Sequence, residues 1–102
     1  MQFVEFPAFT RAVPSILSEK EYLDLQMSLM ERPDEGTLIP GGNGLRKIRV
    51  RSKRKGKSGG SRVIYYWYVS PERIDLCRIY EKSDKADLPK AEIKNILKEL
   101  EK

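Results

Sequence analysis

The stretch that decides the fold is RVIYYWYV, residues 62–69, a run dense in β-branched and aromatic side chains. These residue types favour strands, and an apolar run without alternation is typical of a central strand covered on both faces. Strand character precedes it at residues 45–51, where apolar and cationic side chains alternate, and returns after it at residues 74–80. Three consecutive strands joined by short connections predict an antiparallel meander.

A helix is expected before this meander. Ser18 and Glu21 form a capping box, in which each residue satisfies a free backbone amide of the other, and the helix should end before Pro33. Leucine and methionine side chains follow at helical spacing, so we expect this helix to bury a broad face, with Met27 and Met30 as core filler.

The remaining segments complete an α+β domain. Residues 2–6 are expected to form a strand, followed by a brief helical or irregular turn closed by Pro14, and residues 34–44 form a turn-rich connection. After the meander, Asp87 is interpreted as the N-cap of an amphipathic helix that faces the sheet. Residues 1–102 are therefore predicted to form a single domain, in which helices pack on one face of a small antiparallel β-sheet.

Composition excludes several classes of protein. The 102 residues include no histidine, which excludes zinc hydrolases, Ser-His triads and paired-histidine ribonucleases. The single cysteine, Cys77, excludes an intramolecular disulfide and is expected to be a buried small side chain and not a nucleophile. No apolar stretch is long enough for a membrane span and no secretory signal is visible, so a cytoplasmic location without a membrane partner is expected. No metal ion or cofactor is predicted.

Positive charge is concentrated in one stripe of the chain. Between Arg46 and Arg62 there are nine basic residues and no acidic one, whereas the rest of the chain holds the other 11 of the 20 basic residues and all 15 acidic ones. A basic stripe on a mildly acidic body is typical of a protein that binds a polyanion. A solvated, lysine-rich loop is the alternative.

The sharpest signal for a site is a set of cations on one face of the predicted sheet. Lys47 and Arg49 alternate with apolar residues on one strand, and Arg62 begins the neighbouring strand. Opposed side chains on antiparallel strands lie about 4.5–5.5 Å apart, so these cations repel each other unless an anion lies between them. A phosphodiester backbone is the expected anion, and surface cations on an exposed strand face are the alternative.

A resemblance to the RelE/HigB superfamily of bacterial toxins, closest to the HigB-like subgroup, is carried by LRKIRV at residues 45–50, a basic glycine loop, GSRVIYY at residues 60–66 and IYEK at residues 79–82. It covers residues 45–100, and the N-terminal half only in the order of elements. The resemblance implies a RelE-like two-layer fold and the toxin of a type II toxin–antitoxin pair, a ribosome-dependent mRNA endoribonuclease (mRNA interferase). The implied partners are a cognate antitoxin, the ribosome and its mRNA, and operator DNA reached through the antitoxin.

The family's functional positions map onto residues of this chain. Its cationic catalytic pair falls on Lys47 and Arg49, its arginine at the start of the next strand on Arg62, and its basic residue after the last strand on Lys82. Its base-stacking aromatic residue would fall near Leu88 and is missing here. The residues expected to bind RNA are Arg46, Arg51, Lys53, Arg54, Lys55, Lys57, Tyr66 and Tyr80. For the two tyrosines, ordinary packing in the sheet is the alternative.

Cleavage by a ribose 2′-OH needs a proton acceptor, stabilisation of a dianionic phosphorane and a proton donor for the leaving 5′-oxygen. Without histidine, we expect the acceptor to be Lys47, held neutral by the positive charges of Arg49 and Arg62. The two arginines would stabilise the phosphorane. Lys82 would donate a proton or bind phosphate, with Glu81 as a competing base. Because strand neighbours point to opposite faces, at most one of Glu81 and Lys82 faces the site, and Lys82 is favoured.

Two other functions remain open at this stage. One is a ParE-like gyrase-inhibiting toxin, which shares the fold and cuts no RNA. The other is a non-catalytic RNA-binding module. The cationic strand face favours RNA cleavage over gyrase inhibition, because gyrase inhibition has no need of a phosphodiester-cleaving cluster.

Overall fold

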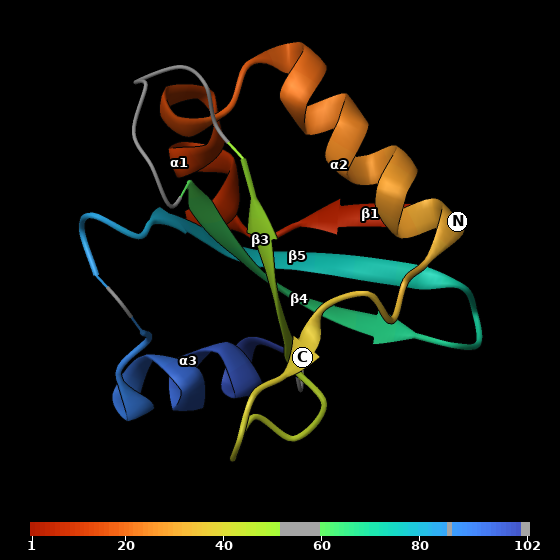
Figure 1. The fold of residues 1–102 in the computed structure, drawn as a ribbon. Helices are drawn as coiled ribbons and strands as arrows, with labels where there is room; N and C mark the ends of the chain where they lie inside the picture. Colours follow the sequence, from red (N-terminus) through yellow and green to blue (C-terminus); the bar gives the residue numbers. More distant parts are fainter. Residues whose placement is uncertain (52–59, 86, 101–102) are drawn as a thin grey trace.

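The computed structural model describes residues 1–51, 60–85 and 87–100 (Figure 1). The elements, in chain order, are β1 (Gln2–Glu5), α1 (Pro7–Ile16), α2 (Glu19–Glu31), β2 (Thr37–Leu38), β3 (Arg46–Val50), β4 (Ser61–Tyr68), β5 (Arg73–Glu81) and α3 (Lys90–Leu100). The strands form one sheet in the order β1-β5-β4-β3-β2. Strands β3, β4 and β5 make the antiparallel meander that the sequence predicts, and β1 pairs parallel with β5. The predicted α+β fold is therefore confirmed.

The sheet carries a hydrophobic cluster on each face. Val63 and Tyr65 of β4 pack with α1 and α2 in one cluster, whereas Ile64 of β4 packs with Ile96 of α3 in the other. Alternate residues of a strand point to opposite faces, so α1 and α2 cover one face and α3 the other (Figure 1). The expectation that helices pack on one face holds for α1 and α2 and does not extend to α3. Below, the side of the sheet that carries α3 is called the α3 face.

An irregularity in the β4–β5 ladder sets what faces α3. Ile64 is opposite Arg78, while Tyr65 is opposite Leu76, so Cys77 is an extra residue on β5. A bulge of this kind places two successive side chains on one face. Cys77 is accordingly buried in the cluster with α3, and Arg78 donates hydrogen bonds to Glu92 and Glu99 of that helix. The bulge thus supplies both an apolar and an ionic contact to α3.

Helix α2 begins as predicted and packs more narrowly than predicted. Ser18 Oγ accepts a hydrogen bond from the Glu21 amide at 3.1 Å, and the Ser18 amide donates to Glu21 Oε1 at 2.8 Å, which confirms the capping box. Met27 and Met30 are 57% and 55% exposed, so the prediction that they fill the core is wrong. The helix buries a narrow stripe that includes Leu25, because α1 supplies much of the apolar cover of this face.

Other boundaries differ from the predicted ones. Pro14 lies inside α1 and does not close it, and β2 interrupts the turn-rich connection. Helix α3 begins at Lys90, so Asp87 is not its N-cap and is free to contact another element. Among the helices described by the structure, none is long and apolar enough to cross a membrane.

Candidate nucleic-acid interface on the α3 face

The sheet brings four of the predicted site residues together. Arg49 of β3 and Arg62 of β4 are directly opposite each other, and Tyr80 of β5 is opposite Arg62 on its other side. Lys47 lies two residues before Arg49 and so shares its face. These four side chains, on three adjacent strands, are called the cationic row below. They lie on the α3 face, as shown by the presence of Tyr80 in the cluster with Ile96.

The arginine pair in the cationic row differs from ordinary surface charge. Like charges directly opposite on antiparallel strands destabilise a sheet. Arg62 is only 7% exposed, so the alternative of surface cations on an exposed strand face does not describe it, whereas Arg49 is exposed. The guanidinium Nη1 of Arg62 donates to the Ser61 carbonyl at 3.4 Å. Burial holds the Arg62 side chain, so it loses little side-chain freedom on binding an anion, and the exposed Arg49 side chain lies on the neighbouring strand directly opposite it.

Lys47 has a partner that the sequence did not predict. Its Nζ lies 3.1 Å from Oδ1 of Asp87, which precedes α3. A carboxylate of the chain itself therefore lies beside the cations for which only a phosphodiester was expected as the anion. The contact places a carboxylate, which can itself accept a proton, beside the lysine that was expected to be the base. Nothing in the sequence distinguishes an aspartate that caps α3 from one that reaches β3, so this contact was missed.

A pocket opens between the β2 segment and α3, next to the cationic row. Its volume is about 360 Å³, and its walls are mainly apolar, from Leu38, Ile39 and Ile93 among others. The polar residues in its lining include Lys47, Asp87 and Tyr80. Pockets with apolar walls and a few converging polar groups are typical ligand sites.

Tyr80 lines this pocket with its ring and keeps its hydroxyl oxygen buried. The residue is 7% exposed, and its buried oxygen has no hydrogen-bond partner among the residues that the structure describes. Burial raises the pKa of the Tyr80 hydroxyl, the Asp87 carboxylate adds to the rise, and the Arg62 guanidinium opposes it. A buried hydroxyl without a partner is costly to the folded state. Because the ring lies in the hydrophobic cluster and the hydroxyl oxygen is buried, Tyr80 does not present a free ring face for stacking on a base.

Tyr66, the other tyrosine predicted to bind RNA, packs against neighbouring residues. The ring of Tyr66 lies 4.8 Å from that of Tyr68, and a Cβ on Gly44 would lie 2.9 Å from its Cε2 atom. Gly44 has a positive φ of 105°, so only glycine suits both the backbone and the close approach of this ring. Tyr66 shares the face of Arg62 and supports the loop before β3.

Some predicted residues are not part of the cationic row. Arg46 points to the opposite face, where its Nη1 donates to the carbonyl of Gly36 at 2.7 Å. Glu81, the competing base, is buried opposite Ser61 and therefore faces the α1–α2 side.

Lys82 is exposed in the turn after β5, and its amide donates to the Gly60 carbonyl at 3.1 Å, which places its backbone near the start of β4. Arg51 is exposed just beyond β3. Outside the described residues lie Lys53, Arg54, Lys55 and Lys57.

Neither the cysteine nor a carboxylate cluster offers further chemistry. Cys77 is buried, as predicted, and burial raises the pKa of its thiol, with the Asp75 charge adding to the rise. No group of three or more potential metal ligands occurs in residues 1–51, 60–85 and 87–100. A scan against models of known protein families found no match to the chain. The resemblance to RelE/HigB toxins therefore stays a prediction.

Proposed function

We propose that this chain is the toxin of a type II toxin–antitoxin pair and a ribosome-dependent mRNA endoribonuclease. The observation that carries the proposal is the placement of Arg49 opposite Arg62, in line with Tyr80 and beside Lys47. An arrangement that sets like charges face to face on a sheet is stabilised by an anion between them, and a phosphodiester is the anion for which two guanidinium groups are well suited.

In the proposed reaction, the ribose 2′-oxygen attacks the adjacent phosphorus and the bond from phosphorus to the 5′-oxygen breaks. The products are a 2′,3′-cyclic phosphate and a free 5′-hydroxyl. Arg49 and Arg62 stabilise the negative charge of the phosphorane. Stabilisation of the transition state by charged groups is expected to be the largest single contribution to the rate. Tyr80, directly opposite Arg62 on β5, packs beneath the phosphate site and lines the neighbouring pocket.

The proton transfers are assigned to the pair formed by Lys47 and Asp87. The Asp87 carboxylate accepts the proton of the 2′-hydroxyl, in place of the neutral lysine expected from the sequence. The Lys47 ammonium, 3.1 Å away, donates a proton to the leaving 5′-oxygen, and the proton held by Asp87 then restores it. Lys82, beyond β5, is left with the role of a phosphate ligand.

A non-catalytic RNA-binding module is the second candidate. It is favoured by the same ion pair, because a lysine neutralised by an aspartate can serve simply to shape a binding surface. The partners proposed for the toxin are its antitoxin, the ribosome and mRNA, and they belong to the first candidate alone.

Mapping of mRNA ends on translating ribosomes, with and without the purified protein, separates the candidates. Codon-phased cuts that disappear with Arg49→Ala support the endoribonuclease, and we expect cleavage to fall by about 100-fold or more. Lys20→Ala is a matched control, because Lys20 is an exposed lysine on α2 that pairs with Asp24. Ribosome binding without cuts would favour the binding module, and loss of DNA supercoiling by gyrase without cuts would favour the gyrase inhibitor.

A further inference from the structure

The outer edge of β3 is open beyond Lys47. Strand β2 pairs with only two residues of β3, Thr37 with Lys47 and Leu38 with Arg46, whereas β4 pairs with all five residues of β3 on the other side. From Ile48 onward, no strand among the described residues covers this edge. An open edge presents unpaired amide and carbonyl groups, which are a template for another strand.

The groups that point out from this edge can be identified. The Leu45 amide donates to Gly42 and its carbonyl accepts from Ile39, both on the β2 side. In a strand, every second residue directs its backbone groups to the same edge. The backbone groups of Arg49 and Arg51 therefore point to the same edge as those of Leu45. The Arg49 amide and carbonyl point away from β4 and have no partner in the described part of the chain.

Specific contacts keep the edge open, because they hold the chain before β2 away from it. The Tyr65 hydroxyl accepts from the Gly36 amide and donates to the Pro33 carbonyl, both at 2.8 Å. Arg46 adds a hydrogen bond to the Gly36 carbonyl. A Cβ at Gly36 would lie 2.8 Å from two atoms of the Tyr65 side chain, so the close approach needs glycine. These contacts divert the chain toward the α1–α2 face just where β2 would otherwise continue along β3.

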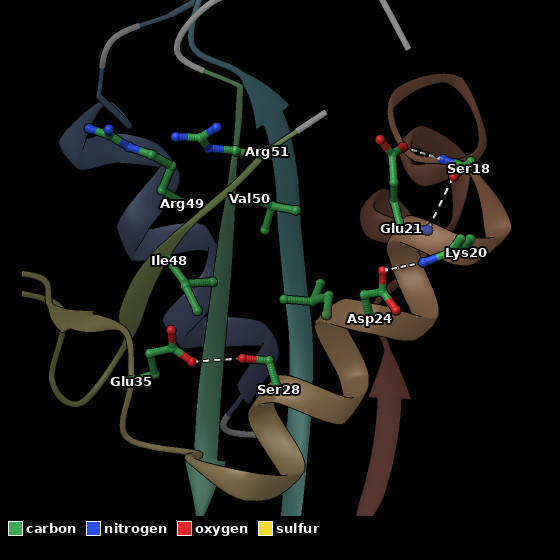
Figure 2. Close-up of a pocket in the computed structure, with 11 residues that line it drawn as sticks. Ser18, Lys20, Glu21, Asp24, Ser28, Glu35, Ile48, Arg49, Val50 and Arg51 are labelled. Atoms are coloured by element: carbon green, nitrogen blue, oxygen red, sulfur yellow. Dashed lines mark hydrogen bonds and ion pairs between the residues drawn. The ribbon is translucent and has the colours of Figure 1, made fainter. Parts of the chain in front are cut away.

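A groove of about 570 Å³ lies between this edge and α2. Figure 2 shows Ile48 and Val50 projecting into it, and Arg49 and Arg51 gathered at one end. Leu25 of α2 lines the groove as well. A strand added here would turn alternate side chains toward this apolar lining and toward the two arginines.

The charges on the two sides of the groove are not equivalent. On α2, Asp24 binds Lys20 and Glu21 belongs to the capping box, as the dashed lines in Figure 2 show. Arg49 and Arg51, in contrast, have no carboxylate partner among the described residues. Pairing of two β3 edges in a homodimer would set arginines against arginines, which is unfavourable.

We propose that this edge takes up an acidic, extended segment of a partner protein, which adds to the sheet as a strand antiparallel to β3. Its apolar side chains enter the groove and its acidic side chains face Arg49 and Arg51, so it alternates between the two kinds. The proposal needs no RNA cleavage, and its test is a binding measurement that stays informative if the chain cuts no RNA.

An eight-residue peptide that alternates glutamate and valine is a suitable probe. Its binding should slow hydrogen exchange of the Arg49 and Arg51 amides, followed by NMR, at least about tenfold when saturated. In an antiparallel pair, two residues that are directly opposite each other have their side chains on the same face of the sheet. A glutamate that faces Arg49 therefore lies directly opposite it, in a hydrogen-bonded pair, and its backbone amide points to β3. N-methylation of the glutamates should weaken binding at least about tenfold, and N-methylation of the valines should leave it nearly unchanged.

Charge reversal provides the second arm. The double variant R49E/R51E should no longer bind the glutamate–valine peptide and should bind a lysine–valine peptide instead, whereas Lys94→Glu on α3 should change neither. Equal effects of the two N-methylated peptides would overturn strand addition. Amide protection by oligouridine and not by the peptide, or protection that appears with a concentration-dependent dimer, would show that RNA or a second copy occupies the edge and would also overturn the proposal.

Discussion

Nζ of Lys47 on β3 lies 3.1 Å from Oδ1 of Asp87, which precedes α3. The contact joins the cationic row to the segment that leads into the last helix, across 40 residues of sequence. Lys47 is about one-third exposed and Asp87 is 79% exposed, so the pair is open to solvent at the mouth of the pocket. Exposed ion pairs of this kind contribute about 0–1 kcal/mol to stability, which makes a structural role alone a weak reason for the contact.

Asp87→Asn tests the proton acceptor. We expect cleavage to fall about 100-fold or more, because an amide cannot accept the proton, while the free energy of unfolding changes by less than about 1 kcal/mol. Single-turnover cleavage on stalled ribosomes and urea unfolding measure the two quantities. The matched control is Asp84→Asn, in the turn after β5. Unchanged cleavage by Asp87→Asn would remove Asp87 from the mechanism.

Arg62→Lys tests whether the planar guanidinium, and not charge alone, is required. Lysine keeps the positive charge and lacks the fork of donors that binds two phosphate oxygens, so cleavage should fall by at least about tenfold. Because Arg62 is buried, unfolding must be measured in parallel, and the rate should be compared only under conditions where both proteins are fully folded. Full toxicity of Arg62→Lys and of Arg62→Ala on expression would contradict the site assignment.

Neutralisation of Lys53, Arg54, Lys55 and Lys57 together tests the basic loop. Each neutralised phosphate releases counterions, so the variant should bind ribosomes or rRNA more weakly and with a shallower salt dependence. The logarithmic slope should decrease by about 0.7–0.9 for each phosphate that the variant no longer neutralises. Filter binding at several salt concentrations measures the slope. A slope equal to that of the parent protein would mean that the loop connects two strands without touching RNA.

Alkaline pH should destabilise the fold. Burial raises the pKa of Tyr22, Tyr65, Tyr68 and Tyr80, and the Glu5 carboxylate adds to the rise for Tyr22. The folded state therefore keeps protons that the unfolded chain loses, from the Cys77 thiol at about pH 8.5 and from the tyrosines at about pH 10, so stability falls as the pH rises past about 8.5 and falls more steeply past about 10. Urea unfolding between about pH 8 and 11 measures the slope, and Tyr22→Phe should flatten it. A stability that is independent of pH across this range would refute the effect.

An inhibitory partner should cover the cationic row. We expect an acidic antitoxin to protect residues of β3 and β4 from hydrogen exchange and to associate more slowly as salt concentration rises. Mass spectrometry of the free and bound protein gives the protection map. Protection confined to residues 1–35 would mean inhibition from a distance, and would contradict direct masking of the row.

The sequence predicted the parts of the fold that depend on local patterns. The Ser18–Glu21 capping box, the central strand and the alternation on β3 follow from neighbours a few residues apart, and all are confirmed. The predictions that were wrong concern which surface a helix packs against. An apolar stripe shows that α3 must pack against another element, yet it carries no information on which face of the sheet the helix will cover. The prediction that the methionines of α2 are buried was wrong for the same reason.

The candidate site divides in the same way. Strand parity was enough to place Arg49 with Arg62, because the meander fixes which residues are opposed. Tyr80 joined them through the register of β4 with β5, which includes a bulge that no sequence pattern indicated. Asp87 was missed because its segment bridges the last strand and the last helix, where tertiary contacts and not periodicity determine its position.

The parallel pairing of β1 with β5 has a consequence for the order in which the molecule can form. Gln2 is opposite Arg73 and Glu5 is opposite Leu76, so β1 has no neighbour in the sheet until β5 exists. Such long-range pairing is slow, since a long loop must close before any contact rewards it. Tyr80 lies on that same last strand. A nascent chain that stops before β5 therefore has neither a complete sheet nor a complete cationic row, and both form only after residue Glu81 has been made.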